Sequence, residues 1–494
     1  MNNHSMNIKR GKFRRRRAVL AGIVLTLTML MPFTAQAAQT EQMPGQKGKW
    51  LSDVVAISSG DYAVYAIKKD GTAWAWGGMR DRGLLGNGSI VPVKTPVRMH
   101  IDEVKDIAGG HMHALILRKD GTVWATGANE DGQLGIGTTS YQPVLEPVQV
   151  PGLKDIVSIS ANYNQSLALG ADGTVWQWGS KDSVHTPSPI PGKLEGLPAI
   201  QAVAAGAWTA TALDRDGQVW VTGSAVTEMN PDRLWEPTIV KSNGLGKAAA
   251  VAAGSEKAAA LLADGSVAVW KNSKTYPTAG ELLSPIKVKN AENASQLAGG
   301  SFSSFSIIKK DGTVWVWDSY MDASEYQAVQ VEGIKGAVDL ANTSLREQYA
   351  LLSDGTVMKW TYHGGLGKPS KPQLVEDSIR VEINDATVDF TYPPTIVNNV
   401  SYVPLRGVFE QLGAKVTWVN PSNTVTVSKG SMNIVINLHT LNTTMNGKQI
   451  ADQLKPFNEN YTTMVPLRFV AEALGAKVNW VKEQHAIRIE LPNP

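Results

Sequence analysis

One short stretch decides the fold, Asp120-Gly121-Thr122-Val123-Trp124. Its pattern, Asp-Gly-x-(Val/Ala)-x, returns along the chain in steps of 43 to 52 residues. A period of this length is typical of architectures that repeat one supersecondary unit. The pattern begins at seven aspartates: Asp70, Asp120, Asp172, Asp216, Asp264, Asp311 and Asp354.

Each copy of the pattern predicts a β-hairpin. The residues before it alternate apolar side chains, as in 63–67, and the residues after Asp-Gly are β-branched or aromatic, which suits a pleated strand. Because Asp-Gly tolerates positive φ, we expect a tight type I′ turn. Ten of the fifteen tryptophans fall in these hairpins, where we expect core packing between sheets, with sugar stacking as the alternative. They are Trp74, Trp76, Trp124, Trp176, Trp178, Trp220, Trp270, Trp315, Trp317 and Trp360.

Flanking segments extend each copy to about four strands. A short apolar segment such as 107–110 precedes each hairpin, and a variable loop followed by a short strand such as 147–150 comes after it. A linear stack of such units would expose its terminal edges, whereas a ring removes them. The sequence therefore predicts a mainly β protein that begins with a seven-bladed β-propeller over residues 50–376.

The second unit resembles a known family. Residues 107–137 contain Ile-Ala-Gly-Gly-His-Met-His, Asp-Gly-Thr-Val-Trp and Gly-Gln-Leu-Gly, and they closely resemble the repeat of the regulator of chromosome condensation propellers. The resemblance spans roughly residues 50–376 and implies the fold. It does not carry over nucleotide exchange on a small GTPase, which an exported chain would not meet. In the other units the histidine at His113 is replaced by Ala63, Gln165, Thr209, Lys257, Ser304 and Glu347.

A different duplication begins near residue 377. Residues 403–418 return 62 positions later as 465–480, with Val-Pro-Leu-Arg and Leu-Gly-Ala-Lys-Val in both copies. Proline at the start, apolar residues at spacings of three and four, and glycine at the end predict a short amphipathic helix between two strands. We therefore expect residues 377–494 to form a small duplicated α+β domain.

This duplication resembles the copper amine oxidase N-terminal-like, or stalk, domain of exported proteins from Gram-positive bacteria. Residues 379–385 fit the opening strand of that family, and Met445-Asn446-Gly447-Lys448 fits the middle strand with its Asn-Gly turn. The family is linked to a non-catalytic stalk region of the oxidase, so the resemblance implies no copper ligands. We expect no cofactor.

The N-terminus has the three parts of a signal peptide, which we assign to residues 1–37. A basic segment that ends at Arg17 precedes the apolar run 18–31 and the small-residue site Ala35-Gln36-Ala37. We expect export with cleavage near Ala37, and a retained membrane anchor is the alternative. All seven charges before residue 38 are positive, so the net charge of +3 becomes −4 in the mature chain. That charge disfavours nucleic-acid binding.

Groups that could support catalysis are sparse. The absence of cysteine excludes disulfides, thiol nucleophiles and cysteine-based zinc sites, and the sequence has no P-loop, Rossmann fingerprint or nucleophile elbow. His111 and His113 are close enough to bind a metal, but a third ligand is not evident, and a structural role is the favoured interpretation. Three loop acids are further catalytic candidates, favoured as ordinary surface acids. Two arginines are expected to brace helix starts or to pair with Glu410 and Glu472, with substrate binding as the alternative. These five are Asp81, Asp131, Asp318, Arg406 and Arg468.

These observations favour a non-catalytic binding or scaffold protein, secreted or at the cell surface. A rigid ring whose loops differ between units suits recognition, although the sequence assigns no catalytic, metal or ligand-binding residue. We expect a monomer that binds an envelope protein or polysaccharide, not nucleic acid, and associates peripherally with the envelope. The alternatives are an extracellular polysaccharide-acting enzyme with its site in the propeller funnel, and an exchange factor by family analogy.

Overall fold

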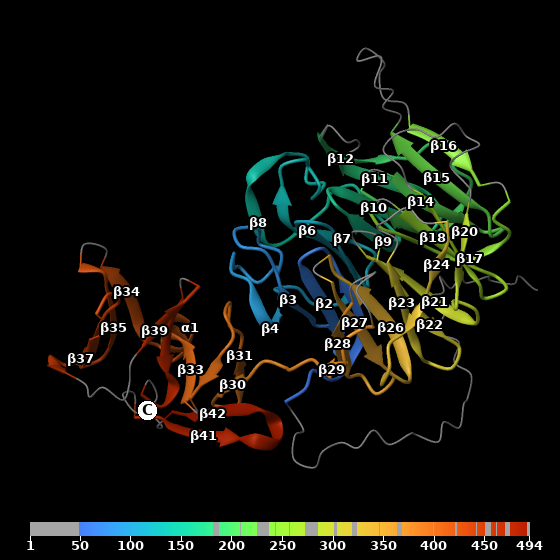
Figure 1. Cartoon of the computed structure of the whole chain (residues 1–494). Coiled ribbons are helices and arrows are strands. Elements are labelled where there is room, and N and C mark those ends of the chain that lie inside the picture. The colour runs from blue at the N-terminus through green and yellow to red at the C-terminus, as the bar shows by residue number, and fades with distance from the viewer. Residues whose placement is uncertain are drawn as a thin grey trace, which may run out of the picture. The chain divides into compact units, whose positions relative to one another are not determined.

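The computed structural model describes residues 49–491 of the chain, with internal gaps, and these residues are mainly strand (Figure 1). The predicted signal peptide, residues 1–37, lies outside the described residues. Within the described part, the longest helices are too short or too polar to cross a membrane. The gaps are residues 181–186, 208, 225–236, 243, 256, 272–284, 301–303, 319–323, 345, 363–367, 399, 420–421, 441, 450–455, 461 and 470–474.

Residues 54–374 fold into consecutive antiparallel sheets, one for each copy of the Asp-Gly pattern. The described residues form seven of these sheets, and in each one four strands follow one another in sequence order. One further strand, β24 (Tyr326–Gln327), lies between the third and fourth strands of the sixth sheet in sequence. It pairs in parallel with β20 of the fifth sheet and so joins the two sheets.

Each sheet has a first, second, third and fourth strand in sequence order. The first strands are β1 (Val54–Ser59), β5 (Val104–Gly109), β9 (Ile156–Asn162), β13 (Ile200–Ala205), β17 (Ala248–Ala253), β21 (Ala294–Gly299) and β26 (Ala337–Asn342). The second strands are β2 (Ala63–Lys68), β6 (His113–Arg118), β10 (Gln165–Gly170), β14 (Thr209–Asp214), β18 (Lys257–Leu262), β22 (Ser304–Lys309) and β27 (Glu347–Leu352). The third strands are β3 (Ala73–Gly77), β7 (Val123–Asn129), β11 (Val175–Ser180), β15 (Val219–Ser224), β19 (Val267–Lys271), β23 (Val314–Asp318) and β28 (Val357–Thr361). The fourth strands are β4 (Val93–Arg98), β8 (Ser140–Gln149), β12 (Pro187–Lys193), β16 (Pro237–Lys241), β20 (Ile286–Lys289), β25 (Val329–Gln330) and β29 (Gln373–Leu374).

The last of these sheets closes against the first. Each first strand contacts the first strand of the next sheet, and β26 contacts β1 in the same way. The backbone N–H of Ile57 in β1 donates to Oδ2 of Asp339 in β26 at 3.0 Å. An isolated antiparallel bridge also joins Trp50 to Glu376, just beyond β29. Closure gives each first strand a neighbouring first strand on both sides, so the series of sheets has no open end.

The predicted type I′ turn is wrong. In the first hairpin, Gly71 N–H donates to the carbonyl of Lys68 and Lys68 N–H donates to the carbonyl of Thr72, each at 2.9 Å. Gly71 has a φ of +84°, whereas the seven turn aspartates, all within the described residues, do not have positive φ. This geometry is that of a type I turn followed by a glycine bulge.

The turn aspartate explains the difference, because its side chain bonds to the backbone ahead of it. In six of the seven turns its carboxylate accepts the N–H of the residue two positions on at 2.9–3.0 Å. The hydroxyl of that Thr or Ser donates to the same carboxylate at 2.6–2.8 Å. In the fourth turn Asp214 instead accepts from the N–H groups of Asp216 and Gln218 at 2.9 Å. Such Asx turns hold the aspartate at negative φ and leave positive φ to the glycine.

The hairpin tryptophans form two groups. Five are buried in the core, as predicted: Trp76, Trp178, Trp270, Trp317 and Trp360. Five that follow the turn directly are only partly buried, and each has a Lys or Arg near its ring at 3.8–5.9 Å from the centroid. These five are Trp74, Trp124, Trp176, Trp220 and Trp315.

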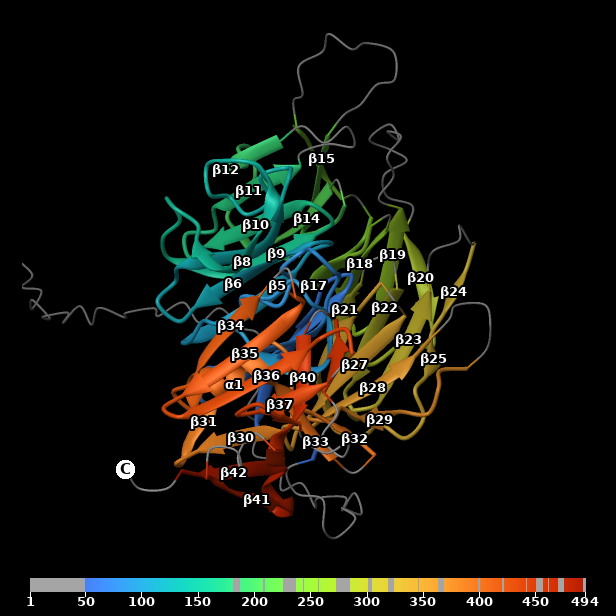
Figure 2. The same ribbon diagram turned by 90° about the vertical axis from the view of Figure 1, so that its left-hand side faces the viewer.

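The described residues of the C-terminal part form three small sheets and the short helix α1 (Leu405–Gln411) (Figure 2). One sheet has the order β31-β30-β42-β41, with β31 (Ala386–Val388), β30 (Arg380–Ile383), β42 (Ala486–Glu490) and β41 (Lys477–Val481). The second has the order β32-β33-β40-β39, with β32 (Thr395–Val397), β33 (Val400–Pro404), β40 (Thr462–Pro466) and β39 (Phe457–Glu459). The third runs from β34 to β38, with β34 (Lys415–Val419), β35 (Thr424–Lys429), β36 (Met432–Asn437), β37 (Thr443–Met445) and β38 (Lys448–Gln449).

The first copy of the C-terminal duplication forms the predicted strand, helix and strand. Helix α1 (Leu405–Gln411) follows β33, buries Leu405, Val408 and Phe409, and leads into β34 after Gly413, which has a φ of +75°. In the second copy β40 and β41 are in place, but residues 470–474, where most of the second helix is expected, lie outside the described residues.

Candidate functional site

The loops between the first and second strands of the first three sheets lie side by side. We call these residues 60–62, 110–112 and 163–164 the rim loops. Their backbones are joined in series, because Asp61 N–H donates to the carbonyl of Gly110 at 3.1 Å and His111 N–H donates to that of Tyr163 at 2.8 Å. Ser344, in the equivalent loop of the last sheet, donates its N–H and its hydroxyl to the carbonyl of Asp61 at 3.2 and 2.7 Å.

Glycine allows neighbouring rim loops to approach closely. A Cβ on Gly60 would lie 2.3 Å from the carbonyl oxygen of Gly110, and a Cβ on Gly110 would lie 2.9 Å from the carbonyl oxygen of Tyr163. Both distances are shorter than a van der Waals contact. The glycines therefore place the side chains that follow them, Asp61 and His111, within reach of each other.

Four side chains from three sheets meet at this point, and we call Asp61, Tyr62, His111 and Tyr163 the rim cluster. Nδ1 of His111 is hydrogen-bonded to Oδ2 of Asp61. The His111 ring lies between two tyrosines, with centroids 5.1 Å from Tyr62 and 5.1 Å from Tyr163. Asp61 is 4% exposed and His111 is 18% exposed, so the carboxylate is enclosed while the imidazole reaches solvent.

The rim cluster includes a residue with an unfavourable backbone conformation. Tyr163 has a φ of +47°, a backbone region that bulky side chains rarely occupy. Burial, together with the nearby charges of Asp61 and Tyr163, raises the pKa of Tyr62, so this phenol keeps its proton. Strained backbone of this kind is found preferentially at sites of function. The cluster thus presents an oriented imidazole and two phenols on a rigid base, a combination that suits hydrogen bonding and stacking with a partner.

The structure separates the two predicted histidines. His113, at the start of β6, is fully buried, and its Nε2 lies 2.9 Å from the hydroxyl of Ser166. Burial and the neighbouring His111 lower its pKa to about 3, so it is neutral. His111 instead faces Asp61 in the rim cluster. The described residues contain no group of three or more His, Asp or Glu side chains arranged to hold a metal ion.

The predicted acids do not form one site. Asp131 is buried beside the rim, where it accepts a hydrogen bond from Nδ2 of Asn164 at 2.6 Å. Asp81 is exposed in the loop between β3 and β4, and its N–H donates to the carbonyl of Ile90. Asp318 ends β23 in the sixth sheet. Asp131 is therefore the predicted acid that lies next to the rim cluster.

The predicted arginines lie in the C-terminal part. Arg406 pairs with Glu410 on α1 at 3.5 Å, as expected. Arg468 is exposed, and its predicted partner Glu472 lies outside the described residues. An exposed pair of this kind stabilises the helix only slightly.

Sequence reasoning missed three members of the rim cluster, Asp61, Tyr62 and Tyr163. A signal for two of them was present, because Asp61 and Tyr163 stand at the same position of their units as His111, two residues before the second strand. That position differs between units, and in the first two units it follows a glycine. Listing the variable position of each unit would have found both residues.

Comparison with known families agrees with this division of the chain. Residues 70–117 and 120–169 match the regulator of chromosome condensation (RCC1) repeat, and a second description of that repeat matches residues 104–133. Residues 382–489 match the copper amine oxidase N-terminal domain. The chain carries RCC1 repeats and a copper amine oxidase N-terminal domain.

The RCC1 repeat is out of phase with the sheet. Residues 70–117 run from the turn of the first sheet through β3 and β4 into β5 and β6 of the second. One repeat thus joins the outer half of one sheet to the inner half of the next. The rim loops at 60–62 and 110–112 fall respectively before and within this match.

Curated relatives share the RCC1 repeats over part of the chain. The human E3 ubiquitin-protein ligase HERC2 is 31% identical over 144 residues, which are 28% of this chain and 3% of that protein. The ultraviolet-B receptor UVR8 of Arabidopsis thaliana is 31% identical over 133 residues, which are 26% of this chain and 29% of that protein. The chain therefore spans less than a third of either relative.

A solved structure shares the fold of the RCC1 part. Prp20p from Saccharomyces cerevisiae, in a structure reported with its binding properties to Gsp1p and histones, matches with a TM-score of 0.50 and 20% identity. The match covers 67% of this chain and 88% of the yeast chain. Together with the repeat match, this likeness shows that the consecutive sheets form an RCC1-type β-propeller.

Proposed function

We propose that this chain is a non-catalytic binding or scaffold protein that contacts its partner through the rim cluster. One observation supports this most strongly: the His111 ring lies between the tilted rings of Tyr62 and Tyr163 and is oriented by Asp61, in loops whose sequences differ between sheets. Polar aromatic side chains on a rigid base are typical of binding surfaces. The partner class we favour is an envelope protein or polysaccharide.

The rest of the architecture is proposed to serve this role. We propose that residues 50–376 form a seven-bladed ring and that residues 377–494, as a duplicated stalk-type domain, hold it near the cell envelope. We also propose export as a monomer, because the N-terminal sequence has the parts of a signal peptide. Mass spectrometry of secreted protein tests export. A start near Ala38 supports it, and an intact Met1 on cytosolic material contradicts it.

A matched set of variants tests the rim cluster. His111→Gln keeps an N–H that can donate to Asp61 but removes the aromatic ring, and Tyr163→Ala removes one stacking partner. Tyr141→Ala, at a side chain that is 89% exposed in β8, is the control. Full-length chains are compared on protein and glycan arrays. We expect a ligand whose signal falls about tenfold with both rim variants and is unchanged with the control. Ligands retained equally by all three variants would contradict the proposal.

A polysaccharide-acting enzyme is the second candidate, and the Asp61–His111 hydrogen bond favours it. A carboxylate that orients an imidazole is the usual support for a general base. Incubation with wall polysaccharides tests this alternative. Turnover that is lost in His111→Gln but kept in Tyr141→Ala would replace the binding proposal with an enzymatic one.

A further inference from the structure

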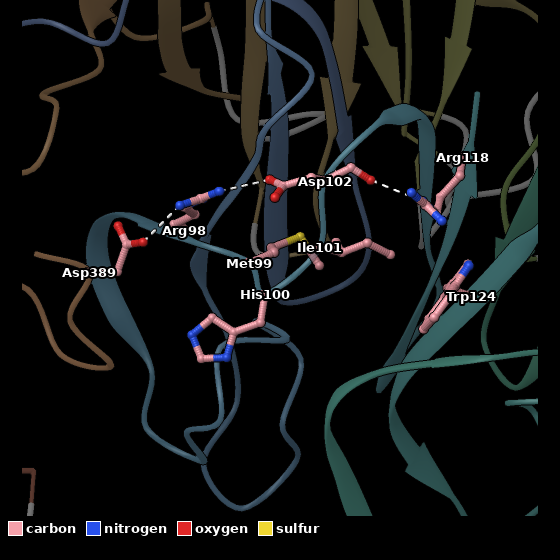
Figure 3. A pocket seen from close by; sticks show the side chains of 8 residues that line it. All are labelled: Arg98, Met99, His100, Ile101, Asp102, Arg118, Trp124 and Asp389. Carbon is pink, nitrogen blue, oxygen red and sulfur yellow. Dashed lines mark hydrogen bonds and ion pairs between the residues drawn. The ribbon is translucent and has the colours of Figure 1, made fainter. Parts of the chain in front are cut away.

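A pocket of about 440 Å³ lies beside the Asp-Gly turn of the second sheet (Figure 3). One wall is the connection from β4 to β5, with Arg98 and His100, and the opposite wall holds Arg118 from the end of β6 and Trp124 from β7. Asp389 of the C-terminal part also lines it. The volume falls within the range of about 300–1,000 Å³ that is usual for small-molecule sites.

Charges in the pocket are already balanced. Arg98 donates to Asp102 at 2.8 Å and to Asp389 at 2.9 Å. Arg118 donates from Nε to the carbonyl of Asp102 at 3.1 Å and from a terminal nitrogen to Asp120 at 3.3 Å. A charged ligand would have to displace one of these partners. Hydroxyl groups, in contrast, can accept from the guanidinium groups and donate to the carboxylates without changing the charge balance.

Trp124 supplies the aromatic wall of the pocket. Its indole N–H is fixed by the hydroxyl of Thr122 at 3.1 Å. The guanidinium of Arg118 lies 5.9 Å from its ring centroid, whereas Lys309 lies 3.8 Å from Trp315 and Lys68 lies 4.2 Å from Trp74. The cations in those two sheets stand closer over the ring. More of the Trp124 face is therefore left for a ligand.

We propose that this pocket binds an uncharged saccharide unit. The C–H face of the sugar packs on Trp124 and buries apolar area, while its hydroxyls bond to Arg98, Asp102 and Arg118. The site is separate from the rim cluster and does not depend on it. A ring with one apolar face and several hydroxyls is the ligand class that matches one aromatic wall and balanced donors and acceptors.

Titration of the full chain with trisaccharides, followed by saturation-transfer NMR and calorimetry, tests the proposal. The probes are cellotriose, maltotriose and N,N′,N″-triacetylchitotriose, with trigalacturonate as an anionic counterpart. We expect at least one neutral probe to bind, and Trp124→Ala to weaken it about tenfold. Trp124→Phe, which retains most of the packing, should weaken binding less. Trp315→Ala is the matched control and should leave affinity unchanged.

Several results would overturn the saccharide site. These are no binding of any neutral probe at millimolar concentration, tighter binding of trigalacturonate, or equal losses in Trp124→Ala and Trp315→Ala. His111→Gln should leave trisaccharide affinity unchanged. A loss there would show that the sugar binds at the rim cluster, which would overturn this site while supporting the rim.

Discussion

The two ends of the propeller strands differ in what is repeated. At the turn end, an aspartate bonds to a Thr or Ser two residues on in six of the seven turns. At the rim end of the first three sheets, the equivalent position holds Asp61, His111 and Tyr163, and these side chains contact one another across sheets. A contact that is repeated within six of the seven sheets serves the fold. A contact made between unlike residues of neighbouring sheets can serve recognition.

The largest expected loss of stability follows replacement of Trp178, and Trp176 in the same strand should contribute much less. Trp178 in β11 is fully buried, and its indole N–H donates to the carbonyl of Gln133 at 2.9 Å, so it joins the second and third sheets. Trp176, nearer the turn, is partly buried beside Lys193. We expect Trp178→Ala to lower the free energy of unfolding by about 3–5 kcal/mol and Trp176→Ala by about 1 kcal/mol. Urea titration measures both, and equal losses would contradict this difference.

A second prediction concerns two partly buried aspartates on the first strands, Asp106 in β5 and Asp339 in β26. Burial raises the pKa of Asp106 to about 7, with a further contribution from the charge of Asp339. Burial also raises the pKa of Asp339 to about 6, although its hydrogen bonds with backbone N–H groups oppose the shift. Because the folded state holds these protons more tightly than the unfolded state, stability should fall as pH rises from about 4 to about 7.

Asp106→Asn tests this pH dependence. Removal of the ionisable group should flatten the decline and make the variant more stable than the wild type by about 1–2 kcal/mol at pH 8. Urea titrations between pH 4.5 and 8 measure it. Asp311→Asn is the control, since hydrogen bonds from Thr313 lower the pKa of that turn aspartate and its effect should appear only below about pH 4. Parallel curves for wild type and Asp106→Asn would contradict the assignment.

The hydrogen bonds of the turn aspartate should contribute less to the free energy of unfolding. Asp311→Ala removes an acceptor for the N–H and the hydroxyl of Thr313, at 3.0 and 2.6 Å. Because the turn is exposed, we expect a loss of about 0.5–1 kcal/mol in the free energy of unfolding. Asp311→Asn, which can still accept these bonds, should lose less. A larger loss for the asparagine variant would show that charge, not hydrogen bonding, stabilises the turn.

The sequence predicts the strands better than their turns. Period, alternation and tryptophan spacing were sufficient for the hairpins, since local pattern determines which residues can pair. The Asp-Gly dipeptide did not reveal the turn type. The turn conformation depends on hydrogen bonds from Thr72 to the carboxylate of Asp70, and on the equivalent bonds in the other turns. In the C-terminal part, Asn384 and Asp385 both have positive φ, at +47° and +65°, as a type I′ turn requires. The rim cluster and the saccharide pocket were missed because their residues come from different units.

The smallest expected change in stability is that of His111→Gln in the rim cluster. This variant tests whether the rim end of the strands serves recognition while the turn end serves the fold. His111→Gln keeps a donor for Asp61, so the enclosed carboxylate retains a partner. The variant loses only ring contacts with Tyr62 and Tyr163, at a side chain that still reaches solvent. We expect a loss of about 0.5 kcal/mol or less in the free energy of unfolding, together with a large loss of partner binding. Paired urea and binding titrations measure the two effects on the same sample. If His111→Gln destabilised the chain as much as Trp178→Ala and binding fell only in proportion to unfolding, the rim cluster would be part of the scaffold, and both strand ends would serve the fold.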